Sequence, residues 1–112
     1  MIDEKDKALR YNAGKTQWSY LPMAEIEDLI KVLEYGATKY TKDNWKKGEY
    51  ISRITDSLMR HIRAYCYEGE DIDSESGLNH IGHILANVVF LKYNQGHPTF
   101  DDRNKSKEKT NG

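Results

Sequence analysis

The amino-acid sequence contains GLNHIGHILANVVFL at residues 77–91, a segment apolar enough to form a core helix. His80, His83 and Asn87 interrupt it at spacings of three, four and seven residues, which place all three on one helical face. Apolar residues extend the same face, so we expect these polar groups to point into the protein. Buried imidazole and amide groups cost free energy unless they find partners. The segment therefore predicts a core helix that carries a polar site.

Helical periodicity also marks two earlier segments, whereas strand patterns are nearly absent. Apolar residues at helical spacing predict a first helix over residues 22–40. A second helix is predicted over residues 51–67, with Ser52 as its N-cap, and a third over residues 77–94. The predicted fold class is all-α, an antiparallel helical bundle whose core is built from these three helices.

The length of 112 residues suits a single domain. We expect a helical domain over residues 8–98, between a flexible N-terminus over residues 1–7 and a disordered polar tail over residues 99–112. Hydrophobic residues make up 38% of the chain and charged residues 31%, which is low apolar content for a self-sufficient core. This composition favours a homo-oligomer, a dimer or a tetramer, that buries apolar surface between subunits.

Charge and composition also bear on partners and location. The formal net charge of −1 favours neither nucleic acid nor an anionic membrane as a partner. No apolar run is long enough to cross a membrane, and the first residues do not resemble a signal peptide. The single cysteine, Cys66, agrees with a reducing compartment. We expect a cytoplasmic protein.

Two motifs resemble known ligand sites but are incomplete. Gly14-Lys15-Thr16 has the ending of a P-loop, but the earlier glycine and the preceding strand are missing. Asp71, Asp73 and Glu75 imitate the start of a calcium loop, but the closing glutamate is absent. Two interpretations of these acidic residues stay open: they cap the third helix, or one or two of them reach a divalent ion.

Chemistry-bearing side chains converge if the second and third helices pack antiparallel. Carboxylates that hold a metal, cations that neutralise phosphate and imidazoles that orient water are the mixture that phosphoryl chemistry needs. The contributing residues are Glu34 from the first helix, Arg53, Asp56, Arg60, His61 and Glu68 from the second, and His80, His83 and Asn87 from the third.

Several of these residues have simpler interpretations. Asp56 and Arg60 are four residues apart and would pair across one helical turn. His61 would be a core histidine with a satisfied hydrogen bond. Trp45 would belong to the core or an interface, or it would stack on a base. The histidines alone are a weak indication of zinc, because no His-Glu-x-x-His motif is present.

The chain resembles the phage-associated dATP/dGTP diphosphohydrolase domain, which is similar to the MazG-like nucleotide pyrophosphohydrolases. The resemblance extends from about Leu9 to Lys92. The segments that carry it are Arg10–Lys15, Val32–Tyr40, Asn44–Gly48, Asp56–His61, Gly69–Gly77 and His80–Asn87. It implies an all-α, metal-dependent, oligomeric domain that cleaves a nucleoside triphosphate to a monophosphate and pyrophosphate, in the host cytoplasm if a phage encodes it.

One departure from this family concerns the metal. MazG-like enzymes bind Mg²⁺ through a glutamate cluster and a Glu-x-x-Asp motif, whereas the corresponding position here reads His80-Ile81-Gly82-His83. Imidazole is a poor ligand for Mg²⁺ and a better one for Mn²⁺, Zn²⁺ or Ni²⁺. Three alternatives remain: a different metal, carboxylate ligands with the histidines behind them or on the phosphates, or a fold that persists without hydrolysis.

The leading hypothesis is a metal-dependent pyrophosphohydrolase of (deoxy)purine nucleoside triphosphates. Non-catalytic nucleotide binding or sequestration is the main alternative, and a helical adaptor whose polar stripe sets subunit register is another. In the hydrolase, Mg²⁺ or Mn²⁺ would be held by Glu34, Asp56 and Glu68, and His61, His80 and His83 would act as ligands or bases. Phosphates would be bound by Lys15, Lys39, Arg53 and Arg60, while Trp45 would stack on the base and Asn87 would orient a neighbour or read a base edge.

Overall fold

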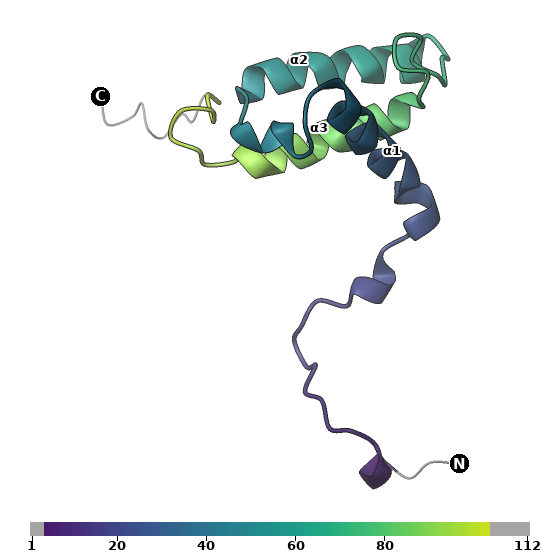
Figure 1. The fold of residues 1–112 in the computed structure, drawn as a ribbon, viewed down its shortest axis with the longest axis vertical. Coiled ribbons are helices and arrows are strands. Elements are labelled where there is room, and N and C mark those ends of the chain that lie inside the picture. Colours follow the sequence, from purple (N-terminus) through teal and green to yellow (C-terminus); the bar gives the residue numbers. More distant parts are fainter. Residues whose placement is uncertain (1–3, 104–112) are drawn as a thin grey trace.

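A computed structural model describes residues 4–103, and all of its regular elements are helical (Figure 1). The body consists of three α-helices: α1 (Met23–Lys39), α2 (Ile51–Ile62) and α3 (His80–Asn94). Short helical turns complete the chain: η1 (Glu4–Asp6), η2 (Trp18–Tyr20), η3 (Asn44–Lys47) and the π-helical η4 (Arg63–Tyr67). Within residues 4–103 the extended pairing is limited to an isolated bridge between Ile72 and Asn79.

α3 lies at the centre of the body and contacts both other helices, and it runs antiparallel to α2 (Figure 1). A glycine allows α1 to approach closely. A Cβ atom on Gly82 would lie 2.5 Å from the Asp28 carbonyl oxygen and 2.9 Å from Val32 Cγ2 of α1. Ala86, 2% exposed, continues the small side chains one turn later. The predicted all-α fold with antiparallel helices is confirmed.

The predicted helix boundaries agree with the structure except at two points. α1 lies within residues 22–40, and α2 with η4 covers residues 51–67. α3, however, begins at His80 rather than residue 77, because Asn79 is its N-cap and accepts a 2.8 Å hydrogen bond from the Ile81 N–H. The prediction of Ser52 as the N-cap of α2 is wrong, because Tyr50 occupies that position.

The segment after α3 folds back onto the start of α2. The Ile51 N–H donates to the Phe100 carbonyl oxygen at 2.9 Å. Asp102 accepts from the Ser52 N–H at 3.0 Å and from the Ser52 hydroxyl at 2.6 Å. Contacts of the body therefore continue beyond residue 98, where we expected the domain to end. The remainder of the predicted tail, residues 104–112, and residues 1–3 of the predicted flexible N-terminus lie outside the described residues.

Residues 5–22, here called the N-terminal arm, extend away from the body (Figure 1), and every one of them is exposed. The radius of gyration is 19.4 Å, compared with about 13 Å for a compact chain of this length. The buried apolar residues of the described chain are few: Val32, Ile51, Ile54 and Ala86. No helix in the described part of the chain has the length and apolar character needed to cross a lipid bilayer.

Candidate functional site

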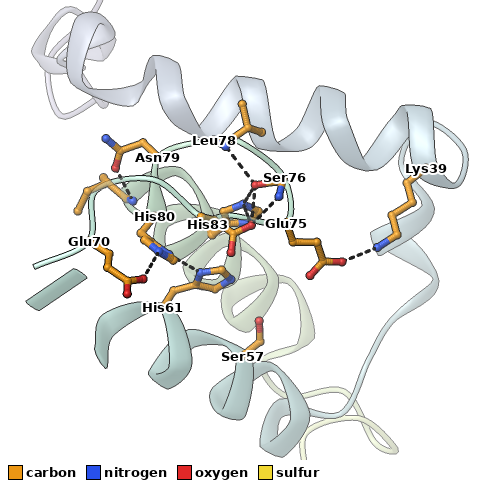
Figure 2. Close-up of polar contacts among 12 residues, drawn as sticks. Lys39, Ser57, His61, Glu70, Glu75, Ser76, Leu78, Asn79, His80 and His83 are labelled. Atoms are coloured by element: carbon orange, nitrogen blue, oxygen red, sulfur yellow. Dashed lines mark hydrogen bonds and ion pairs between the residues drawn. The ribbon is translucent and has the colours of Figure 1, made fainter. Parts of the chain in front are cut away.

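Antiparallel packing brings three histidines together where α2 ends and α3 begins. His61 of α2 and His80 of α3 form a hydrogen bond between their Nδ1 atoms at 2.8 Å (Figure 2). The His61 ring also stacks on the His83 ring, with centroids 4.4 Å apart and planes 3° from parallel. The predicted inward orientation is confirmed for α3, since His80 is 4% exposed and Asn87 7% exposed. We call His61, His80 and His83, with Asp73 and Ser76 described next, the histidine cluster.

The loop between the helices supplies the acidic side of this cluster. Asp73 Oδ2 accepts hydrogen bonds from the Ser76 N–H and hydroxyl, both at 2.8 Å. The Ser76 oxygen in turn lies 2.7 Å from His83 Nε2. A backbone bond holds the loop against α3, because the His80 N–H donates to the Asp71 carbonyl oxygen at 2.8 Å. The acidic loop is thus an ordered turn that carries a carboxylate to the histidines.

The environment favours neutral imidazoles at His61 and His83 beside an ionised carboxylate at Asp73. Burial lowers the pKa of His61 below its usual value, and the neighbouring His83 lowers it further. Burial likewise lowers the pKa of His83, although the charge of Asp73 opposes this. For Asp73, burial would raise the pKa, but the hydrogen bonds from Ser76 outweigh burial and hold it below the usual range. Near neutral pH the cluster therefore offers unprotonated nitrogen and carboxylate oxygen.

These donors are close enough to share an ion. In His61, Asp73 and His80, one ligand atom from each residue lies within 4.8 Å of the others, the only such set of three among residues 4–103. His80 contributes a further feature, because its buried Nε2 has no hydrogen-bond partner. Glu70 Oε1 lies 3.9 Å from this nitrogen. Two imidazoles and one carboxylate are a donor set suited to borderline transition metals rather than to Mg²⁺.

A pocket of about 640 Å³ adjoins the cluster. α1, η3, α2 and α3 all contribute to its lining, and its size is typical of small-molecule sites. His83 belongs to both the pocket and the cluster. The other predicted site residues in the lining are Lys39, Trp45, Arg53 and Asn87.

The lining also includes aromatic and amide side chains. Trp45 packs against Phe90 and Tyr93, with ring centroids 5.4 and 5.1 Å apart. Asn87 donates from Nδ2 to the Ser57 hydroxyl at 3.3 Å. Trp45 thus both packs against neighbouring rings and lines the pocket, and the sequence accordingly allowed two interpretations of it.

The predicted metal ligands Glu34, Asp56 and Glu68 are not brought together. All three are exposed, and none lines the pocket or belongs to the His61–Asp73–His80 set. Glu68 instead forms an ion pair with Arg63 at 3.2 Å. α1 buries Val32 against α3, and α2 buries Ile54, so residues two positions further along each helix face outward. The prediction of a metal site on these carboxylates is not supported by their positions.

Two predicted phosphate ligands also lie elsewhere. Arg60 is exposed on α2 and does not line the pocket, while Lys15 lies in the exposed N-terminal arm. Two further residues were not predicted from the sequence: Ser76 lies in the histidine cluster, and Lys47 lies in the pocket lining. The spacing of Asp73 and Ser76 was an available signal, because an Asp that accepts from the residue three positions later is a common turn.

Comparison with known proteins defines the class of this all-α domain. A family model described as dATP/dGTP diphosphohydrolase, N-terminal, matches residues 5–103. The dATP/dGTP diphosphohydrolase of Salmonella phage PMBT28 is 31% identical over 96 residues, which cover 85% of this chain and 32% of the relative. The chain thus spans about a third of the length of this curated relative. No solved structure matches the chain.

The chain belongs to the family of dATP/dGTP diphosphohydrolase N-terminal domains. The resemblance inferred from its sequence segments is therefore confirmed.

Proposed function

We propose that this domain hydrolyses a purine deoxynucleoside triphosphate to the monophosphate and pyrophosphate, in the cytoplasm where such nucleotides are found. The observation that carries the proposal is the sharing of His83 between a nucleotide-sized pocket and a histidine–carboxylate cluster. The name of the phage relative, a dATP/dGTP diphosphohydrolase, supports the substrate class.

Cations and aromatic surface in the pocket match the two parts of a nucleotide. Lys39, Lys47 and Arg53 line it and would neutralise phosphate oxygens. Lys39 pairs with Glu75 at 3.6 Å, and both side chains are largely exposed, so a triphosphate would displace this weak pair. Trp45 would stack on the purine, and the Asn87 amide would hydrogen-bond its edge.

The hydrogen bonds of His83 suit it to act as the base. The Ser76 hydroxyl donates to Asp73, so its oxygen accepts a hydrogen bond from the N–H at His83 Nε2. This tautomer leaves His83 Nδ1 unprotonated. His83 Nδ1 would take a proton from the water that attacks the α-phosphorus, while the bond to the bridging oxygen breaks and pyrophosphate leaves. A bound divalent ion would supply charge neutralisation at the phosphates and a more acidic water.

The test is direct incubation of the chain with dATP and dGTP, each with Mg²⁺ and with Mn²⁺, followed by separation of the products. We expect monophosphate and pyrophosphate in equal amounts, with dCTP a poorer substrate. Arg53→Ala should raise KM, whereas Lys31→Ala, an exposed cation of α1 outside the pocket, should not.

Absence of products with every nucleotide and metal would overturn the proposed hydrolysis. Tight binding with the nucleotide recovered intact would then favour the non-catalytic alternative.

We also propose that the chain forms a homo-oligomer. The N-terminal arm presents Leu9, Trp18 and Tyr20 to solvent at 92%, 76% and 81% exposure. Leucine and aromatic side chains are usually buried to a much greater extent. The body also leaves Ile30 and Val88 half exposed. A second copy of this chain would cover both surfaces. Light scattering should give a dimer or larger, which Trp18→Ser with Tyr20→Ser should weaken; a monomeric parent chain would contradict the proposal.

A further inference from the structure

We infer that the histidine cluster binds a divalent ion that accepts imidazole ligands, such as Mn²⁺ or Zn²⁺, in preference to Mg²⁺, through His61, Asp73 and His80. This inference builds on the proposed hydrolase site, because such an ion would lie beside the pocket that would hold the phosphates. Ion binding itself, however, is measured without turnover.

The distance between the two imidazoles is the first support. Their Nδ1 atoms are 2.8 Å apart. Two histidine nitrogens bound to one Zn²⁺ at about 2.0–2.1 Å with a tetrahedral angle are about 3.4 Å apart. If the two Nδ1 atoms moved apart by a few tenths of an ångström, an ion could bind between them, and two metal–nitrogen bonds would replace the hydrogen bond. The Asp73 carboxylate belongs to the same set of donors within 4.8 Å.

The orphaned nitrogen of His80 is the second support. In the hydrogen bond between His61 and His80, one Nδ1 donates and the other accepts. In either case the buried His80 Nε2 has no partner, and Glu70 Oε1 at 3.9 Å is too far for a hydrogen bond. Ligation through Nδ1 would fix the proton of His80 on Nε2, facing Glu70. Metal-bound histidines usually donate their second N–H to a carboxylate in this way.

The third support is the oxygen donor. Asp73 Oδ2 accepts from the backbone and hydroxyl of Ser76, which orients the carboxylate and leaves Oδ1 available. Two imidazoles with one carboxylate leave open positions for water and a substrate oxygen. Mg²⁺ prefers oxygen ligands, and the carboxylates that would serve it, Glu34 and Asp56, face outward from α1 and α2.

The inference is tested by titrating the chelator-treated full chain with Mn²⁺, Zn²⁺ and Mg²⁺ in a calorimeter, without nucleotide. We expect one Mn²⁺ or Zn²⁺ per chain, each bound at least tenfold more tightly than Mg²⁺. Manganese paramagnetic resonance should show nitrogen coupling. His80→Ala and Asp73→Asn should each weaken Mn²⁺ binding by about tenfold or more. His97→Asn is the matched control, because His97 lies outside the cluster and its acceptor role toward Thr99 is kept.

Asp73→Asn guards against a trivial result from misfolding, because an amide oxygen still accepts from Ser76 and circular dichroism reports the fold. Equal affinity for Mg²⁺, or Mn²⁺ binding unchanged in both folded variants, would overturn the inference. Selective Mn²⁺ binding without turnover would keep the metal site and overturn the proposed hydrolysis. If His80→Ala still hydrolyses the nucleotide with Mg²⁺, the proposed hydrolysis is kept and the proposed metal site is overturned.

Discussion

The two ends of the α2–α3 pair are packed with different kinds of side chain. At one end, the segment that leads into α2 packs through aromatic rings on α3 and on the segment after it. Trp45 of η3 packs on Phe90 at 5.4 Å, and Tyr50, the N-cap of α2, packs on Phe100 at 5.3 Å. At the other end, the same two helices meet through the imidazoles of the histidine cluster. Aromatic burial stabilises a fold, whereas buried imidazoles are costly unless they are paired. One end thus holds the helices together, and the other is where the proposed chemistry would take place.

One buried polar residue at each end makes the contrast sharper. Asn94, 1% exposed at the aromatic end, donates to the Phe90 carbonyl oxygen at 2.9 Å and accepts from the Glu49 N–H at 3.3 Å. His80, 4% exposed at the other end, keeps an unpaired Nε2. A satisfied amide is a structural element, whereas an unsatisfied buried imidazole calls for an explanation, and the proposed metal site would supply one.

The largest expected effect is on catalysis at the histidine end. His83→Ala should lower kcat by about 10²-fold or more, because the proposed base is removed. Its melting temperature should change little, since the ring is partly exposed and its burial disfavours charge. Steady-state kinetics and thermal unfolding on the same preparation provide the check. If His83→Ala instead lowered the melting temperature strongly and left kcat unchanged, the histidine end would be the one that stabilises the fold.

The next effect is on stability at the aromatic end. Trp45→Ala should cost about 2–4 kcal/mol of unfolding free energy, somewhat less than a fully buried tryptophan, because contacts with Phe90 and Tyr93 are lost. Urea unfolding followed by circular dichroism measures the loss. His61→Ala is the matched variant at the opposite end and should cost clearly less; equal losses would remove the distinction.

A smaller effect concerns the segment that closes the aromatic end. Asp102 accepts from the Ser52 N–H and hydroxyl in the first turn of α2. Asp102→Ala should therefore lower the urea midpoint of unfolding, as loss of a helix cap does. Asp102→Asn keeps an acceptor and should lower the midpoint by less than half as much. If both variants unfold at the parent urea midpoint, the segment does not stabilise α2.

The smallest effect is a pH dependence at the histidine end alone. His61 and His83 have pKa values lowered in the folded state, so the unfolded chain takes up protons first as pH falls below about 6.5. Stability from these groups is present above that pH and is lost as pH falls through the folded values. Urea midpoints between pH 7.5 and 5 should decline, and His61→Gln with His83→Gln should flatten the decline. If the urea midpoint of this double variant declined with pH as steeply as that of the parent chain, the pKa values of His61 and His83 would not be lowered in the folded state.

The helices and the histidines were predictable because both depend on local periodicity. Apolar spacing located α1, α2 with η4, and α3 apart from the residue at which it begins. The spacing of His80, His83 and Asn87 put them on one inward face. An antiparallel connection then placed His61 opposite His80 without further information. The segment at residues 77–91 thus contained both the core helix and half of the site.

The identity of the acidic partner depended on packing. Glu34 and Asp56 lie on helices whose buried faces are set by contact with α3, including the close approach at Gly82, and both face solvent. Asp73 lies in a loop, where no periodicity reveals direction, and hydrogen bonds from Ser76 aim it at the histidines. Sequence therefore specified which local faces are apolar or polar. The proposed metal donor set and the pocket arose only when residues distant in the chain were brought together by helix packing.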